Sequence, residues 1–401
     1  MAIHDANNST DQINFDELFQ YTNLKFNKLA SFDEIYFLGD HTDTFSTRAL
    51  DIAKSLINFF GVVVFSISPE KRIRISNQLP LKKNWSFIKI EELIERSKSK
   101  NKTVLVIDFN DNLAGKNIAK KLESRGVTVR DCLFAMHQLN LVHTYLTIKE
   151  ERQYVLDNLN EFKKISECFG DFLSKKTLFS RLKSILTLDR TALIEVSFPM
   201  ITFMNNYSNI AGIVVRDDEV FVDAGAANGD TVSQFFHLSR GNYRKIHAFE
   251  PDSKNFLSLQ MLCEYLPNTK SYFAGLGEAE GSMDFYEYPE NRFGSNFFEK
   301  SAPNQVKTVR KIMKLDDVLD DASLIKIDVE GWESNVIKGA ANIFQKSKPN
   351  LTISAYHYPN DIIEILTTVN AICKYKNIGL RHYSSNLFDT QLIFSDSQEF
   401  I

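Results

Sequence analysis

The sequence predicts an α/β protein with two successive parallel sheets. Short apolar runs alternate with segments of helical spacing up to about residue 135, and again from about residue 209 of the 401 residues. Buried parallel strands form near-continuous apolar runs, and helices cover both faces of their sheet. Residues 136–188 have helical spacing and many charges instead. We therefore expect a small Rossmann-like domain at 1–135, a helical connector at 136–195 and a second α/β domain at 196–401.

The first domain is expected to hold five strands. They are predicted at residues 35–39, 61–67, 85–90, 103–108 and 127–134, with helices at 15–29, 47–60, from 91, and 113–125. The loop at 39–44 (GDHTDT) follows the first strand, where ligands bind in open parallel sheets. It has one glycine and no P-loop lysine, so acceptor positioning or dimerisation is favoured over nucleotide binding.

A glycine-rich turn opens the second domain at residues 220–230 (VFVDAGAANGD). Asp223 ends an apolar strand, Gly225 and Gly229 allow a tight turn near a ligand, and a helix follows from about residue 231. Ala227 departs from the pattern G-x-G-x-x-G, which disfavours an NAD-dependent dehydrogenase and suits a ligand without pyrophosphate. Asp223 could hold a ligand ammonium group through a charged hydrogen bond. A purely structural turn is the alternative.

A second acidic residue follows at the end of the next predicted strand, residues 245–251. Glu250 lies at a distance from Asp223 that is typical of a carboxylate accepting hydrogen bonds from a ribose diol. Alone it could equally be an exposed carboxylate at a strand end. Together with the glycine-rich turn, it predicts a nucleoside-containing cosubstrate.

Several motifs, in their order, resemble those of the FkbM-type methyltransferases across roughly residues 210–395. They are DAGAANGD at 223–230, FEP at 249–251, LDD at 315–317, IKIDVEGWE at 325–333 followed by GA at 339–340, AYHYPND at 355–361 and LRHY at 380–383. The resemblance implies a class I methyltransferase fold with a seven-stranded sheet and methyl transfer from S-adenosylmethionine, usually to a hydroxyl oxygen. By that similarity, Asp223, Gly225, Gly229 and Glu250 are cosubstrate residues. We extend the predicted cosubstrate site to its neighbours Ala226, Asn228, Asp230 and Asp328.

The acceptor side is expected at the ends of two later strands. The strand at 324–331 carries Asp328 and Glu330, which share one face if it stays extended, and the strand at 351–357 ends at His357. A hydroxyl must lose its proton when it is methylated, so we predict His357 as the general base, with Asp328 orienting it or the acceptor. A hydrogen-bonded structural histidine is one alternative. A Mg²⁺ or Mn²⁺ site made by Asp328, Glu330 and His357 is another, although no metal is predicted.

Two further motifs have weaker interpretations. His382 is expected on a late strand in a structural role. Residues 294–296 (GSN) follow a predicted hairpin, and could either line the acceptor pocket or form a simple turn.

Composition limits the remaining function classes. The formal net charge of −4 gives no general attraction to nucleic acid or an anionic membrane, and neither partner is expected. No signal peptide or membrane-spanning run is evident, and the four cysteines are isolated, which suits reduced thiols in the cytoplasm. The favoured function is an O-methyltransferase acting on a hydroxyl of a carbohydrate or another small molecule. A non-catalytic binding module for partner enzymes is the alternative, and a homodimer stays open.

Overall fold

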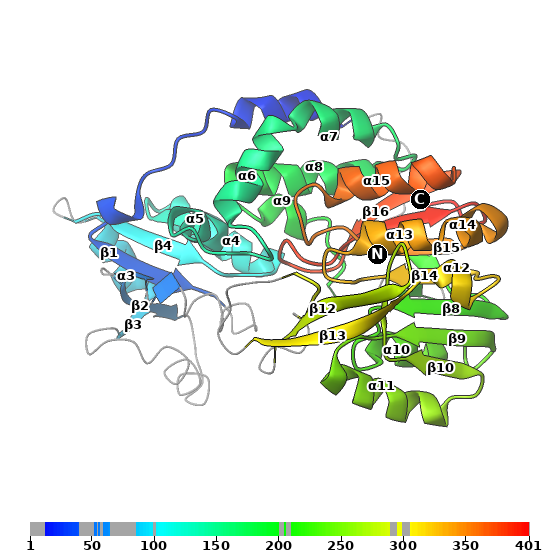
Figure 1. Ribbon diagram of the computed structural model, residues 1–401. Helices are drawn as coiled ribbons and strands as arrows, with labels where there is room; N and C mark the ends of the chain where they lie inside the picture. Colours follow the sequence, from blue (N-terminus) through cyan, green and yellow to red (C-terminus); the bar gives the residue numbers. More distant parts are fainter. Residues whose placement is uncertain are drawn as a thin grey trace. The chain divides into compact units, whose positions relative to one another are not determined.

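The computed structural model describes ten stretches of the chain. They are residues 13–39, 52–53, 55–56, 59–64, 86–98, 102–199, 204–205, 210–288, 295–298 and 305–400. The chain divides into two compact units: unit 1 comprises residues 1–163 and 175–196, and unit 2 comprises 164–174 and 197–401 (Figure 1). Most of the segment predicted as a separate connector thus belongs to unit 1 in this division.

Unit 1 is built on a five-stranded parallel sheet. The strand order is β3-β2-β1-β4-β5, formed by β1 (Glu34–Leu38), β2 (Phe59–Val64), β3 (Ser86–Lys89), β4 (Val104–Asp108) and β5 (Thr128–Asp131). Two helices, α3 (Ile90–Ser97) and α4 (Leu113–Glu123), contribute Leu93 and Leu122 to a core with Tyr36 and Val106 of the sheet. The prediction of a parallel α/β sheet from alternating apolar runs is confirmed.

Some boundaries in unit 1 differ from the prediction. The fifth strand ends at Asp131, three residues early, because its side chain accepts a hydrogen bond from the Leu133 N–H and caps α5 (Cys132–Gln138). The helix expected at 15–29 is limited to a 3₁₀ turn, η2 (Phe15–Tyr21), and a short η3 (Leu29–Ser31). Most of the helix predicted at 47–60, and residues 40–44 of the first loop, lie outside the described residues.

Helices follow β5 as the charged, helically spaced sequence predicts. They are α5, α6 (Ile148–Asp157), α7 (Leu159–Ser166), α8 (Phe172–Thr187) and α9 (Thr191–Ile194). A capping box between Thr147 and Glu150 starts α6.

Unit 2 is built on a seven-stranded mixed sheet. The strand order is β10-β9-β8-β14-β15-β17-β16, and β17 runs antiparallel to both its neighbours. The strands are β8 (Glu219–Ala224), β9 (Tyr243–Phe249), β10 (Thr269–Tyr272), β14 (Leu324–Ile327), β15 (Asn350–Ser354), β16 (Asn377–His382) and β17 (Thr390–Ser395). The chain leaves β8 in one direction along the sheet and later continues from β14 in the other, so the strand order reverses between these two central strands.

This reversal places the helices of unit 2 in two layers. Figure 1 shows α10 (Asp230–Leu238) and α11 (Ser253–Tyr265) on one side of the sheet, with α13 (Glu333–Gly339), α14 (Ala341–Ser347) and α15 (Asp361–Ile372) on the other. Right-handed crossovers require this arrangement when the order reverses. Phe235 and Leu259 from the first pair of helices pack on Phe221 and Ile246 of the sheet. Ligands of such sheets bind at the carboxyl edge where the order reverses.

Short elements complete unit 2. A three-stranded sheet has the order β11-β13-β12, from β11 (Gly275–Leu276), β13 (Val306–Met313) and β12 (Gly281–Glu287). The strands β6 (Met204–Asn205) and β7 (Ile213–Val214) form a two-stranded sheet, and α12 (Leu315–Val318) precedes β14.

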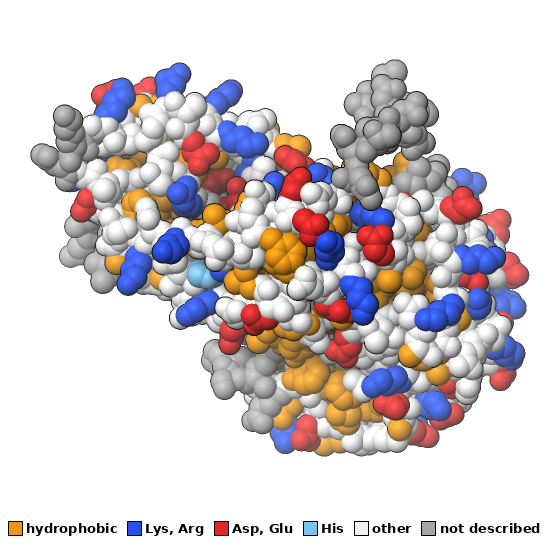
Figure 2. Space-filling model, turned by 90° about the horizontal axis from the view of Figure 1, so that it is seen from above, with side chains coloured by type: hydrophobic (Ala, Val, Ile, Leu, Met, Phe, Trp, Pro, Cys, Tyr) orange, Lys and Arg blue, Asp and Glu red, His pale blue; other side chains and the backbone are white. Residues whose placement is uncertain are grey.

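The surface charges and the state of the cysteines agree with what the composition predicts. Lys and Arg side chains are interspersed with Asp and Glu side chains over the face seen in Figure 2. All four cysteines are free thiols, as predicted. Among the described residues, the helices are too short or too polar for any of them to cross a membrane.

Candidate active site

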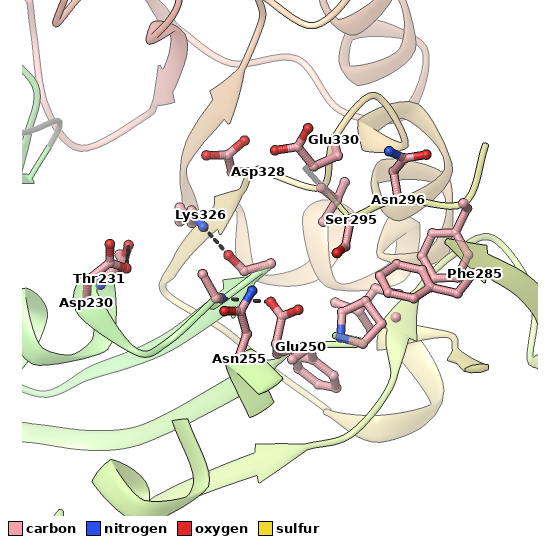
Figure 3. Close-up of a pocket in the computed structure, with 18 of the residues that line it drawn as sticks. Asp230, Thr231, Glu250, Asn255, Phe285, Ser295, Asn296, Lys326, Asp328 and Glu330 are labelled. Atoms are coloured by element: carbon pink, nitrogen blue, oxygen red, sulfur yellow. Dashed lines mark hydrogen bonds between the residues drawn. The ribbon is translucent and has the colours of Figure 1, made fainter. Parts of the chain in front are cut away.

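A cavity of about 340 Å³ opens at the carboxyl ends of β8, β9 and β14 (Figure 3). Four of the predicted site residues line it: Gly225, Asp230, Glu250 and Asp328. The glycine-rich turn, the end of β9 and the end of β14 therefore meet at one edge of the sheet. The volume of the cavity lies in the range of small-molecule binding sites.

The turn after β8 depends on its two glycines. Gly225 has a φ of +78°, and a Cβ there would collide with the backbone carbonyl oxygen of Asp328. Gly229 has a φ of +89° and stands at the N-cap of α10. Left-handed backbone costs glycine little, so the turn can pass close to the end of β14. Gly225 lines the cavity, whereas Ala226, Asn228 and Gly229 are absent from its lining.

Glu250 is held by backbone groups at the end of β9. Its Oε2 accepts a hydrogen bond of 2.7 Å from the Ala227 N–H, and its Oε1 accepts one of 2.8 Å from the Asp252 N–H. Burial raises the pKa of Glu250 to about 8, although both of these hydrogen bonds lower it. The carboxyl group is thus fixed in position, and its carboxylate form is costly unless a ligand adds further donors.

Asp223 lies beneath the turn and outside the cavity lining. It is fully buried, and its Oδ1 is 3.0 Å from Nζ of Lys326, which also donates a hydrogen bond of 2.5 Å to the Gly225 carbonyl oxygen. Burial raises the pKa of Asp223 to about 6, and the charge of Lys326 limits the rise. The predicted contact with a ligand ammonium is therefore corrected: in this structure Asp223 binds the ammonium of Lys326 and supports the turn.

Asp328 and Glu330 both line the cavity, but the chain between them is not extended. The strand β14 ends at Ile327, and Glu330 has a left-handed φ of +58°. Oε1 of the buried Glu333 holds this turn by accepting hydrogen bonds from the N–H groups of Val329 (3.0 Å) and Gly331 (3.2 Å). The extended geometry on which a shared strand face depended does not persist, and a tight turn brings both carboxylates to the cavity lining instead.

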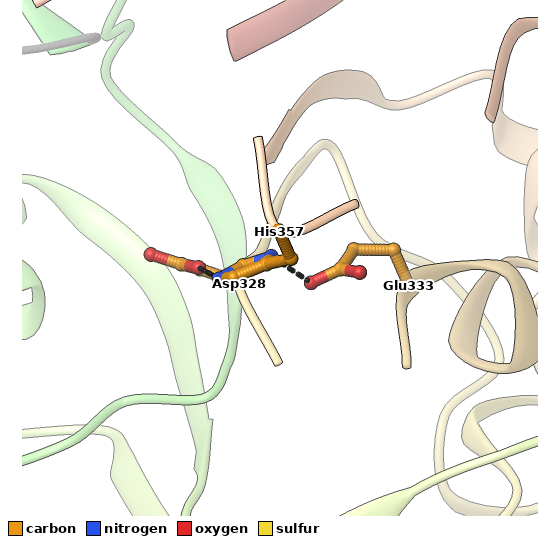
Figure 4. A group of neighbouring side chains, drawn as sticks. All are labelled: Asp328, Glu333 and His357. Carbon is orange, nitrogen blue, oxygen red and sulfur yellow. Dashed lines mark ion pairs between the residues drawn. The ribbon is translucent and has the colours of Figure 1, made fainter. Parts of the chain in front are cut away.

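His357 lies between Asp328 and Glu333 (Figure 4). It is 2% exposed and absent from the cavity lining, with Nδ1 3.2 Å from Oε1 of Glu333 and Nε2 3.5 Å from Oδ1 of Asp328. Glu330 is also near, at 3.8 Å from Nε2. Burial lowers the pKa of His357, but Glu333, Glu330 and Asp328 together raise it to about 10. A ring that is protonated at neutral pH cannot accept a proton, so this geometry does not support the predicted base.

The same side chains bear on the metal alternative. Ligand atoms of Asp328, Glu333 and His357 lie within 4.8 Å of one another. The compact group thus contains Glu333 in place of the Glu330 considered from the sequence. Its Glu333 oxygen already accepts two backbone hydrogen bonds, from the N–H groups of Val329 and Gly331.

Several lining residues were not singled out in the sequence. Among them are Asn255, Phe285, Lys326, Tyr356 and Asp389. Lys326 left a signal, because a lysine between two isoleucines of a buried strand needs a buried partner. Ser295 and Asn296 of the GSN motif line the cavity, and Gly294 lies outside the described residues.

The remaining features are the buried His382 and three cavity residues with left-handed backbone. His382 is fully buried on β16, and its Nδ1 is 2.9 Å from Oγ1 of Thr390, which fits the predicted structural role. Ala227, Glu330 and Asp389 have left-handed φ values, and all three line the cavity. Strain of this kind often gathers at functional sites.

Comparisons with known proteins find methyltransferases. Residues 223–376 match the methyltransferase FkbM domain. "Methyltransferase 1" of Beauveria bassiana (strain ARSEF 2860) is 26% identical over 150 residues, which make up 31% of this chain and 59% of that protein. The crystal structure of methyltransferase FkbM from Methylobacillus flagellatus KT superposes with a TM-score of 0.66 at 19% identity, covering 94% of this chain and 98% of the other, so the two share their fold. Residues 223–376, which lie in unit 2, are therefore similar to a methyltransferase FkbM domain.

Proposed function

We propose that unit 2 binds S-adenosylmethionine in the cavity and transfers its methyl group to a hydroxyl oxygen of a carbohydrate or another small molecule. The observation that carries this proposal is the meeting of Gly225, Glu250 and Asp328 around one cavity at the point where the strand order reverses. The resemblance to class I methyltransferases implies a seven-stranded sheet, and the main sheet of unit 2 has seven strands. When bound, the cosubstrate supplies a methyl group activated by its sulfonium.

The cosubstrate would bind along the glycine-rich turn. Glu250 is placed to accept hydrogen bonds from the two ribose hydroxyls, since its carboxyl group is fixed at the end of β9. Gly225 lets the turn pass close to the backbone of Asp328, so that both residues line the cavity. Asp230, in the first turn of α10, and Asp328 add negative charge to the lining, which suits a cationic sulfonium.

Asp328, at the cavity wall, is our candidate for the group that takes the hydroxyl proton. His357 then acts as a positioning residue: its cationic ring lies against Asp328 and Glu330 from the protein side. This exchanges the two roles predicted from the sequence, because the carboxylate faces the cavity and the imidazole does not.

Calorimetric titration of S-adenosylmethionine and S-adenosylhomocysteine tests the binding step. Wild type should bind both, and Glu250→Ala should lose most of the affinity, whereas Glu280→Ala, an exposed change in the same unit, should bind normally. Absence of binding by folded wild-type protein would refute the proposal. Binding without turnover on a broad panel of hydroxyl acceptors would instead favour the non-catalytic module.

A further inference from the structure

Helix α11 is apolar on two opposite faces. Leu259 and Cys263 are buried against the sheet of unit 2. On the outer face, Leu257, Met261 and Tyr265 are 61%, 60% and 86% exposed. A helix that covers a sheet normally has one apolar face and one polar face. The outer face of α11 therefore has the apolar composition of a protein surface that packs against another surface.

The exposed apolar residues form a continuous stripe. Leu257, Met261 and Tyr265 are spaced by four residues and so lie on one side of the helix. Exposed apolar side chains scattered singly are ordinary, but a contiguous patch marks an interaction site. Two exposed charged residues, Lys254 and Glu264, lie on the same side near the two ends of the helix.

We propose that this stripe packs antiparallel against α11 of a second copy of the chain, around a two-fold axis. In one register, Leu257 meets Met261 of the second copy, and Lys254 meets Glu264 of the second copy. Both pairs are centred at the level of Leu259, so one axis satisfies both. A two-fold interface requires such self-complementarity, since each pair occurs twice.

The charges favour a second copy over an unrelated partner. Lys254 and Glu264 are about 15 Å apart along the helix axis, with the apolar stripe between them. An antiparallel copy presents the opposite charge at each end, whereas a parallel copy would place like charges together. A single pair of helices makes a small interface, so the dimer should dissociate on dilution in the micromolar range.

Sedimentation velocity across about 1 to 200 µM full-length protein tests the proposal. Wild type should shift from monomer to dimer in this range. Met261→Glu should weaken dimerisation at least tenfold, because it places two carboxylates in the apolar centre. Val309→Glu is the matched control, since Val309 is 64% exposed on β13 and should leave the association unchanged. Unchanged circular dichroism would show that each variant folds.

Charge reversal tests the register itself. Lys254→Glu alone and Glu264→Lys alone should each weaken self-association, because each puts like charges together. An equimolar mixture of these two variants should recover dimers, since both pairs in the mixed dimer are again opposite in charge. A monomeric wild type at every concentration, a dimer that Met261→Glu does not weaken, or a mixture that fails to recover would overturn the proposal.

Discussion

Two buried carboxyl groups at or near the cavity, Asp223 and Glu250, differ in the groups that offset the free-energy cost of their burial. Asp223 has the ammonium of Lys326 at 3.0 Å, and its pKa rises only to about 6. Glu250 has two backbone N–H donors, and its pKa rises to about 8. A full opposite charge offsets desolvation better than amide dipoles do. Glu250 is therefore the group whose charge state should control ligand binding near neutral pH.

The affinity for S-adenosylhomocysteine should rise with pH. Ionised Glu250 accepts hydrogen bonds from two ribose hydroxyls, whereas the protonated acid keeps one oxygen as a donor. Titration calorimetry between about pH 6.5 and 9 should show wild-type affinity increasing toward the pKa of Glu250, and Glu250→Gln should bind weakly with a flat profile. A variant that keeps the wild-type slope would assign the effect to another group.

The raised pKa of Glu250 also makes the stability of the fold depend on pH. The pKa of folded Glu250, about 8, exceeds its ordinary value of 4.5, so the folded state holds this proton more tightly than the unfolded state. Its contribution is fully present below about pH 4.5 and is lost as the pH rises toward 8. In urea unfolding without ligand, Glu250→Gln should therefore lose less stability than wild type between pH 5 and 8.

Asp328 and His357 should differ in their effects on turnover. Asp328→Asn should lower kcat by about 10²–10⁴-fold, the usual contribution of a general base, while S-adenosylhomocysteine binding is largely kept. His357→Gln should lower kcat less and move the acid limb of the pH–rate profile to higher pH, because a cation next to the carboxylates is lost. His357→Lys, which can restore that cation, should move the limb back. A His357→Gln variant with reduced kcat but an unmoved pH profile would leave only a structural role.

At the scale of elements, the turn after β8 and the turn after β14 depend on each other. Gly225→Ala should both strain the left-handed backbone and force the carbonyl of Asp328 away. Gly126→Ala is the matched control, because Gly126 has a φ of +85° with nothing near its added Cβ, and should cost only about 1–2 kcal/mol. Gly225→Ala should cost more in chemical unfolding and abolish cosubstrate binding. Equal costs, with binding kept, would show that the two turns move independently.

Elements with continuous apolar sequence were predictable, and their ends were less so. The runs around Val106 and Phe221 specify buried parallel strands whatever surrounds them. The ends of β5 and β14 depend on single side chains, Asp131 as a cap and Glu333 as a support for the turn. Local sequence contains these residues but does not show which backbone N–H groups they will meet.

The site residues also divide into those that local sequence predicts and those that it does not. The glycine-rich turn and Glu250 are local signals, so their meeting at one edge follows from the fold. The Lys326–Asp223 pair and the carboxylates around His357 are contacts between separate elements. The effect of these contacts on protonation depends on distances and burial, which local sequence does not contain. The sequence therefore predicted His357 as the base and Asp223 as a ligand contact.

At the scale of the whole molecule, the two units should respond to different changes. In unit 1, buried Asp131 is paired with both Lys116 and Arg190, the latter at 3.0 Å. Arg190→Met should destabilise unit 1 by about 3–5 kcal/mol, the usual result of removing one partner from a buried ion pair. Lys98→Met, which breaks the exposed pair with Glu95, should cost at most about 1 kcal/mol.

Scanning calorimetry can separate the two responses. Arg190→Met should lower one unfolding transition, and S-adenosylhomocysteine at a hundredfold excess over its Kd should stabilise the other by about 2.7 kcal/mol. The ligand binds the folded form of unit 2 alone in our proposal, so mass action acts on that unit. A single transition that both changes shift together would mean that the units unfold cooperatively.

The support that Glu333 gives to the turn after β14 has a practical consequence for redesign. Its carboxylate fixes Val329 and Gly331 through their backbone N–H groups, while the side chain of Glu330 points into the cavity from a left-handed position. Asparagine tolerates that backbone conformation better than most residues. A library varied at position 330, starting from Glu330→Asn, should therefore change the lining of the cavity while Glu333 still holds the backbone of the turn.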